Sequence, residues 1–207
     1  GALDYKLQDG DIQRWDFHDW SFHQFIPAIV GDFPEPFRNG YGGVIYPTII
    51  VYQDGWEEDA RRVADKLNRL GIENVSIRGI NELQEDEKES YNLILLGTAD
   101  FPPIAELNQV WRRLGFYAHF QDSMLKVFDP RGEPAAEYGA GAGVIQATQS
   151  PWNPKGIGVC ENTVWIVSGS DTAGVKAAVN TLVNRDTDFK YAYAVVIAAG
   201  EVIRVPQ

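Results

Sequence analysis

The chain has 207 residues, 44% of them hydrophobic, which is enough to bury a sizeable core in one large domain or in one domain with an appendage. The formal net charge of −11 argues against a nucleic-acid partner and against an anionic membrane surface, because both require a basic face. The single cysteine excludes an internal disulfide framework and a cysteine-based zinc site, and no apolar run reaches the roughly 18–20 residues of a membrane span.

Two short runs that alternate apolar and polar residues stand at the start of the chain. They are residues 3–7 and 12–17, and they flank Asp9-Gly10, a dipeptide typical of hairpin turns. We therefore expect a β-hairpin, which must pack on another element because an isolated hairpin is only marginally stable in water. Residues 18–47 follow as a long loop rich in aromatic residues. A loop of this length is typical of a functional or interface-forming segment, or it covers one edge or face of a sheet.

Three later stretches share one plan, in which a short buried strand is followed by a turn and then by a helix with an apolar face. The strands are expected at 48–52, 93–96 and 164–167, and the helices at 57–70, 103–114 and 173–182. The last unit is the clearest, since alanine and valine recur at helical spacing after a cluster of capping residues. Further strands are expected at 75–78, 124–128, 144–148, 192–199 and 201–205, and a charged, solvated connection at 85–89.

This succession of strands and helices predicts an α/β fold, built as a three-layer sandwich around a mainly parallel sheet. The N-terminal β-hairpin and the aromatic-rich loop would pack on it. The chain is thereby divided into residues 1–47, which are either the tail of an upstream module or a cover for the sheet, and residues 48–207, which form the α/β domain.

In an open α/β sheet, ligands bind in the crevice beyond the carboxyl ends of the parallel strands. The turns expected there offer backbone donors, hydroxyls and carboxylates, which suit an uncharged polar ligand such as a sugar. The candidate binding residues are Asp54, Gly55, Thr98, Asp100, Ser168, Ser170 and Asp171. We assign no catalytic residue, because none of these turns supplies an evident general base with a partner.

Two glycine-containing patterns suggest other chemistry, and each has a simpler interpretation. The run Gly139–Gly143 resembles a phosphate-binding loop, but it leads into a predicted strand where such a loop would open a helix, so a flexible or close-packed turn fits better. The segment Ser168-Gly169-Ser170 lies where a nucleophile elbow would lie but lacks the Gly-x-Ser-x-Gly pattern. Helix capping by Ser170 or Asp171 explains it better.

A metal site is the remaining candidate. His18 and His23, with Asp16 and Asp19, are suitable ligand types. The two histidines are not at the spacing that places two ligands on one helix face, so we expect surface histidines in an aromatic loop. The sequence predicts neither a metal nor a cofactor.

Four segments together resemble the Rossmann-like α/β domain of archaeal surface-layer proteins. They are residues 92–98, residues 143–146, which end in Gln146, residues 150–154, with the sequence Ser-Pro-Trp-Asn-Pro, and residues 164–182. A similar series occurs in the periplasmic subunit of bacterial cellulose synthase, and the likeness covers residues 48–185. Separately, residues 5–15 resemble the closing hairpin of the transcobalamin-like domain, which implies that residues 1–20 are the tail of a neighbouring module.

Both resemblances imply extracytoplasmic, non-catalytic modules whose motif residues are structural. We therefore expect a cell-surface or secreted module for binding or assembly, with other extracellular protein modules or a polysaccharide as its partners. Two alternatives stay open. One is a hydrolase or transferase that uses the predicted crevice, with Asp100 and Asp171 as titrating groups. The other is a corrinoid-binding module, which depends on residues 5–15 alone.

Overall fold

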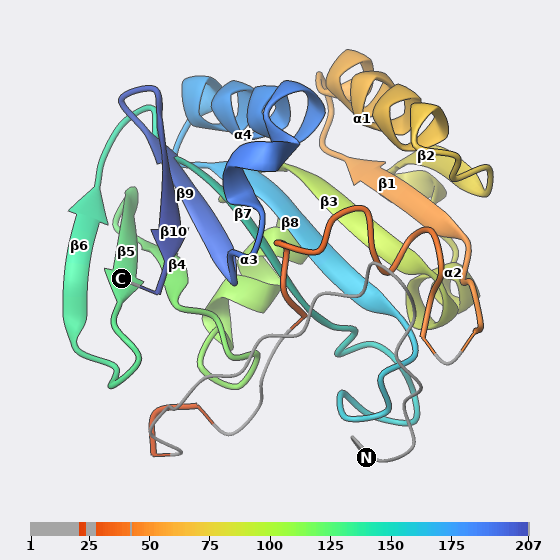
Figure 1. Ribbon diagram of the computed structural model, residues 1–207, viewed down its shortest axis with the longest axis horizontal. Coiled ribbons are helices and arrows are strands. Elements are labelled where there is room, and N and C mark those ends of the chain that lie inside the picture. Colours follow the sequence, from red (N-terminus) through yellow and green to blue (C-terminus); the bar gives the residue numbers. More distant parts are fainter. Residues whose placement is uncertain (1–20, 24–27, 42, 207) are drawn as a thin grey trace.

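The computed structural model describes residues 21–23, 28–41 and 43–206. The strands in these residues are β1 (Thr48–Tyr52), β2 (Val75–Gly79), β3 (Asn92–Thr98), β4 (Ala118–Gln121), β5 (Met124–Phe128), β6 (Pro134–Tyr138), β7 (Gly143–Gln149), β8 (Thr163–Gly169), β9 (Ala194–Ala198) and β10 (Glu201–Val205). Within the described residues they form a seven-stranded sheet of order β10-β9-β7-β8-β3-β1-β2 and a three-stranded sheet of order β4-β5-β6 (Figure 1).

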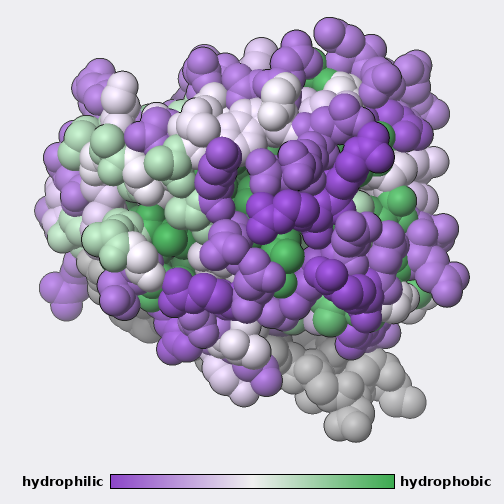
Figure 2. All heavy atoms as spheres, turned by 90° about the horizontal axis from the view of Figure 1, so that it is seen from above, coloured by the Kyte–Doolittle hydropathy of each residue, from purple (hydrophilic) through white to green (hydrophobic). Residues whose placement is uncertain are grey.

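The helices of the described residues are α1 (Glu57–Arg69), α2 (Glu85–Ser90), α3 (Pro102–Gln109) and α4 (Thr172–Asn184), with short 3-10 turns η1 (Ile80–Glu82) and η2 (Asp186–Phe189). Helices α1 and α4 lie together over one face of the large sheet, and α3 and the small sheet lie against the other face (Figure 1). The outer sides of α1 and α4 are mostly hydrophilic (Figure 2), as expected for helices that bury one face only. None of the helices described is long and apolar enough to cross a membrane.

The α/β class predicted from the sequence is confirmed, but the large sheet is mixed. Strands β2, β1, β3 and β8 are parallel neighbours. Strand β7 is antiparallel to β8 and to β9, and β10 is antiparallel to β9. The prediction of a mainly parallel sheet therefore holds for one half of the sheet only. The connection from β7 to β8 is a loop of residues 150–162 without a helix, whereas parallel neighbours are usually joined through a crossover helix.

Several elements differ from their predicted form. Residues 85–89, expected as a solvated connection, lie in the short helix α2, whose Glu87 carboxylate accepts a hydrogen bond from the Gln84 N–H (3.1 Å). Helix α3 ends at Gln109, earlier than predicted, and β4 and β6 were not predicted. These elements are short or exposed, so they leave little hydrophobic periodicity in the sequence.

Each face of the large sheet has its own hydrophobic core, because alternate residues of a strand point to opposite faces. Trp165 lies at the centre of the core under α1 and α4 and is fully buried. Its ring contacts Phe33 and Phe37, with ring centroids 5.8 and 5.2 Å away. The segment that precedes β1 therefore helps to build this core.

The aromatic-rich region is placed only in part. Phe37 belongs to the core under α1 and α4, and Phe22 belongs to the core on the opposite face. Its described residues thus contact both faces of the sheet. The hairpin predicted at residues 3–17 lies outside the described residues, so the boundary at residue 47 stays a prediction.

Candidate functional site

The predicted crevice residues lie at the ends of strands or in the turns that follow them, and the fold brings these to one edge of the large sheet, here called the carboxyl edge. Strands β1, β3 and β8 are adjacent and parallel, so the turns that follow them lie side by side. The Ala99 N–H donates to the Gly169 carbonyl (3.2 Å), which joins the turn after β3 to the end of β8. The geometric expectation from the sequence holds here, and the chemistry depends on what these side chains contact.

Gln53, which the sequence did not single out, ties the first two turns together. Its side-chain oxygen accepts hydrogen bonds from the Thr98 N–H (2.9 Å) and lies 2.8 Å from the Thr98 hydroxyl. A Cβ added at Gly97 would lie 2.8 Å from that same oxygen, so a glycine is needed for the Gln53 side chain to pass. The Thr98 hydroxyl is also within hydrogen-bond distance of the Asp100 carboxylate. Thr98 is therefore engaged in holding the two turns.

Neither Ser168 nor Ser170 offers a free, exposed hydroxyl to a ligand: one is buried and the other is hydrogen-bonded to the backbone. Ser168 is fully buried, and its hydroxyl has no hydrogen-bond partner among the described residues. The Ser170 hydroxyl donates to the Gly139 carbonyl (2.9 Å) and so fixes the turn that precedes β7. Of the predicted crevice residues, Asp54, Gly55 and Asp100 are the ones that stay exposed. None of the three lines the hollow described below.

Asp171 is the N-cap of α4, as one interpretation of the sequence predicts. One carboxylate oxygen accepts a hydrogen bond from the Gly174 N–H (2.9 Å), and the other accepts one from the Gly141 N–H (2.8 Å). These backbone donors, that of Gly174 first, hold the pKa of the Asp171 carboxyl below its usual value. A carboxylate held in this way joins the 139–142 turn to α4 and is poorly suited to serve as a general acid.

This linkage makes the stability of the fold depend on pH. The lowered pKa means that the contribution of Asp171 is complete above the pKa of the unfolded state, about 3.9, and is lost as the pH falls through the folded-state pKa. We expect Asp171→Asn to lower the stability at neutral pH and to flatten its acid dependence below about pH 5. Denaturant titrations across this range would measure both effects, and parallel pH profiles for the variant and the wild type would contradict the assignment.

Gly143 and Gly174, near the start of α4, are packed against neighbouring backbone. In a phosphate-binding loop, this space would be left open for the ligand. A Cβ added at Gly174 would lie 2.1 Å from the Ala142 carbonyl oxygen, and one at Gly143 would lie 2.4 Å from the Gly174 carbonyl oxygen. The Ala142 carbonyl also accepts the Ser170 N–H (2.9 Å). The turn that leads into β7 therefore packs directly against the start of α4, in agreement with the close-packed interpretation of the glycine run.

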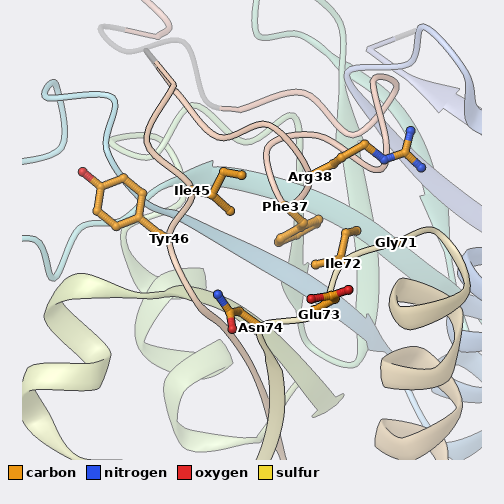
Figure 3. A pocket seen from close by; sticks show the side chains of 8 residues that line it. All are labelled: Phe37, Arg38, Ile45, Tyr46, Gly71, Ile72, Glu73 and Asn74. Carbon is orange, nitrogen blue, oxygen red and sulfur yellow. The ribbon is translucent and has the colours of Figure 1, made fainter.

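A different feature marks the opposite side of the sheet, the amino edge, where β1, β2, β3, β8 and β9 begin. A hollow of ≈ 190 Å³ opens there between residues 37, 38, 45 and 46 on one side and residues 71–74 on the other. It is lined by Phe37, Arg38, Ile45, Tyr46, Gly71, Ile72, Glu73 and Asn74. In Figure 3 the side chains of Phe37, Ile45 and Ile72 converge, while the guanidinium of Arg38 extends away from them. That guanidinium donates to the Leu70 carbonyl (2.7 Å) at the end of α1.

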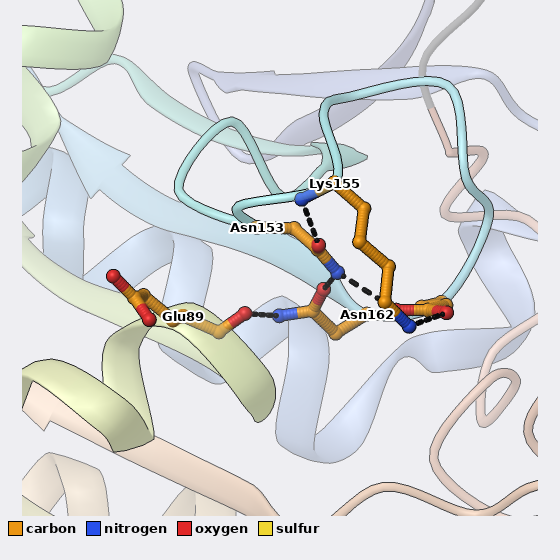
Figure 4. A network of polar contacts seen from close by, with 5 residues as sticks. Glu89, Asn153, Lys155 and Asn162 are labelled. Atoms are coloured by element: carbon orange, nitrogen blue, oxygen red, sulfur yellow. Dashed lines mark hydrogen bonds and ion pairs between the residues drawn. The ribbon is translucent and has the colours of Figure 1, made fainter.

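The loop of residues 150–162, also at the amino edge, is held by a polar network (Figure 4). The Asn162 amide donates to the carbonyls of Glu89 (3.1 Å) and Tyr91 (2.9 Å), and the Asn153 amide donates to the Asn162 side-chain oxygen (2.8 Å). Lys155 pairs with Glu161 (2.6 Å), and this contact raises the pKa of Lys155.

The neighbouring Trp152 extends this anchoring to the helices. Its indole N–H donates to the Glu106 carboxylate (2.9 Å) on α3, and the Lys88 ammonium of α2 lies 4.6 Å from its ring centroid. The Trp-Asn pair of the Ser-Pro-Trp-Asn-Pro segment therefore connects the loop to α2, α3 and the start of β8. We assign these two residues a structural part.

Most of the exposed large apolar residues of the described part of the chain belong to loops at the same edge. Among the described residues, the large hydrophobic residues that are exposed are Val44, Ile45, Val110, Val159 and Tyr191. All but Val110 lie in loops that enter or leave strands at the amino edge. The sequence offered no signal for this, because single apolar residues in loops have no period and only the strand directions bring them together.

The residues considered as metal ligands, which the sequence analysis interpreted instead as surface histidines in a loop, can be followed only in part. The His23 ring nitrogen Nε2 lies 3.0 Å from the Phe116 carbonyl oxygen, and the histidine is buried. His18, Asp16 and Asp19 lie outside the described residues. Within residues 21–23, 28–41 and 43–206, no three His, Cys, Asp or Glu side chains are grouped so that they could hold a metal ion.

The two edges of the sheet thus differ in kind. The carboxyl edge carries polar side chains that hold turns together, and the amino edge carries the hollow and the exposed apolar side chains. No protein-family model matches the chain, and a search of curated proteins finds no match either.

Proposed function

We propose that the protein is a non-catalytic module of the cell surface or of a secreted protein, and that it acts in binding or assembly. Its partners would be other extracellular protein modules or a polysaccharide, contacted through the amino edge of the large sheet. The proposal includes the finer classification of the fold as a three-layer, Rossmann-like domain of the surface-layer type, with α1 and α4, the large sheet, and α3 with the small sheet as the layers.

The observation that carries the proposal is the position of the exposed apolar side chains. Val44 and Ile45 are 52% and 51% exposed, and they stand beside the hollow at the amino edge. Single exposed apolar residues are ordinary, but an adjacent exposed pair, one of which lines a hollow, is typical of a contact surface. The outer faces of α1 and α4 are hydrophilic by comparison (Figure 2).

The carboxyl edge gives less support to the hydrolase or transferase alternative. A general acid or base needs a carboxyl group that is free to exchange its proton near the working pH. Both oxygens of Asp171 accept backbone hydrogen bonds, and Thr98 and Ser170 hold turns together. The binding proposal assigns these residues to the scaffold.

The amino edge can be tested with the double variant Val44→Asp, Ile45→Asp. We expect it to lose at least about tenfold in affinity for the partner, because two apolar contacts are replaced by charges that must be desolvated. Co-sedimentation with insoluble cellulose, chitin and peptidoglycan would measure polysaccharide binding, and analytical ultracentrifugation would measure association between protein modules.

The matched control is the double variant Asp54→Ala, Asp100→Ala, which removes exposed carboxylates of the carboxyl edge and should bind as the wild type does. If the control lost binding while the amino-edge variant kept it, the contact surface would be at the wrong edge. A wild-type protein that is strictly monomeric and binds none of the three polysaccharides would contradict the proposal as a whole.

A further inference from the structure

Tyr191 occupies a backbone position that normally favours glycine. Residues 189–192 form a turn closed by a hydrogen bond from the Ala192 N–H to the Phe189 carbonyl (2.9 Å). Lys190 has φ −54° and ψ 134°, and Tyr191 follows with φ 66°. These angles are those of a type II turn, whose third position requires a positive φ and is usually glycine or asparagine. A bulky side chain is strained there.

The surrounding structure fixes this turn without burying the tyrosine ring. The Tyr191 N–H donates to the Gly31 carbonyl (2.9 Å), and the Gly31 N–H donates to the Ala192 carbonyl (2.9 Å). A Cβ added at Gly31 would lie 2.2 Å from the Ala192 nitrogen, so the two segments are in backbone contact. The Tyr191 side chain is nevertheless 61% exposed. A strained aromatic residue that contributes little to the core is typical of a binding contact.

The hollow at the amino edge has the chemistry to receive such a side chain. Phe37 and Ile72 are buried behind it and Ile45 flanks it, which provides an apolar surface for an aromatic ring, and the Asn74 amide lies close by (Figure 3). Its volume of ≈ 190 Å³ is below the roughly 300–1,000 Å³ of sites for drug-sized ligands, so it suits a single side chain.

The turn that carries Tyr191 and the hollow also carry opposite charges. The Lys190 ammonium lies 5.4 Å from the centroid of the Tyr191 ring, so a positive charge accompanies the ring. Glu73 lines the hollow and is exposed. Within the described part of the chain, neither Lys190 nor Glu73 has an ion-pair partner. A ring that entered the hollow could therefore bring Lys190 toward an unpaired carboxylate.

We propose that Tyr191 of one copy of the chain inserts into the hollow of a second copy, with Lys190 facing Glu73. The inference rests on the proposed function, whose amino-edge surface it assigns to contact between copies. The donor turn and the hollow are different surfaces. Repetition of one contact therefore extends a chain of copies, and a reciprocal exchange of both contacts closes a pair.

The central test replaces Tyr191 with glycine, the residue that the turn favours. We expect Tyr191→Gly to raise the melting temperature, because strain is relieved, and to weaken self-association at least about 30-fold, because an aromatic anchor is lost. Sedimentation velocity over a concentration series measures the association. Val110→Asp, which charges an exposed site outside both surfaces, should associate as the wild type does.

Mixing two variants tests whether the anchor and the hollow meet. Ile45→Asp should weaken association strongly by charging the hollow, and Tyr191→Gly should weaken it strongly by removing the anchor. An equimolar mixture should form a one-to-one complex, because one intact anchor and one intact hollow remain. A swap of charges gives an independent check: Lys190→Glu should weaken the wild-type contact by up to about fivefold, and adding Glu73→Lys should restore it.

Failure of this inference can be told apart from failure of the proposed function. A monomeric wild type, or a Tyr191→Gly protein that associates as the wild type does, would overturn the anchor. If the amino-edge variants then still lost polysaccharide binding, the proposed function would stand with a different partner. A mixture of Ile45→Asp and Tyr191→Gly that stays monomeric would also overturn the pairing of anchor and hollow.

Discussion

Gly174→Ala should destabilise the protein by about 3 kcal/mol or more, although alanine normally favours a helix over glycine by about 1 kcal/mol. The added Cβ would lie 2.1 Å from the Ala142 carbonyl oxygen, and both are backbone-anchored, so neither atom can move aside cheaply. The turn before β7 would have to shift away from α4. Urea denaturation, monitored by circular dichroism, would measure the loss.

Gly158→Ala is the matched control for this substitution. A Cβ at Gly158 has open space around it, and its backbone does not adopt a positive φ. The control should change stability by less than about 0.5 kcal/mol. Equal stabilities for the two alanine variants would mean that the contact between α4 and the 139–142 turn is not as close as the structure has it.

Trp165→Ala is the second substitution with a large expected effect, a loss of about 4 kcal/mol. Trp165 is fully buried, and the rings of Phe33 and Phe37 pack on it from a segment distant in sequence. Its removal would leave a cavity and loosen the segment that carries Phe37, a residue that lines the hollow. Hydrogen exchange in residues 28–41 should therefore rise along with the loss of global stability.

Trp165→Phe separates ring packing from hydrogen bonding. Among the described residues, the Trp165 indole N–H has no acceptor, so a phenylalanine gives up part of the ring volume and no hydrogen bond. We expect this variant to lose less than half as much stability as Trp165→Ala. If the phenylalanine variant were as unstable as the alanine variant, the indole N–H would be making a hydrogen bond that stabilises the fold.

The local elements were largely predictable because each leaves a pattern in adjacent residues. Four apolar residues at 93–96, followed by Gly97, lie within β3, and the spacing of Ala60, Val63 and Leu67 marks the buried face of α1. The capping part of Asp171 was also visible, since a short polar residue before an apolar period is typical of a helix start. The short, exposed elements α2 and β6 were missed because they bury no periodic face.

The candidate crevice shows where prediction from the sequence ends. The sequence identified Thr98, Ser168 and Asp171 as polar residues at strand ends, and the fold does bring their turns to one edge. It gave no indication that Gln53 and Gly141 would engage two of these side chains or that Ser168 would be buried, because both depend on residues far apart in the chain. The order and direction of the strands allow the position of the crevice to be predicted. Which of its side chains are free to bind a ligand depends on hydrogen bonds and packing with residues distant in the sequence.

By itself, the sequence determined the α/β class and most of the strand and helix segments of residues 48–205, with α2, β4 and β6 as the exceptions. These follow from local propensity and periodicity, which act between residues a few positions apart. Tertiary structure alone decided that β7 runs antiparallel to β8, and that Ile45 and the exposed Tyr191 both lie at the amino edge. Strand direction and long-range contact are set by how the elements pack, and a hydrophobic period carries no information about either.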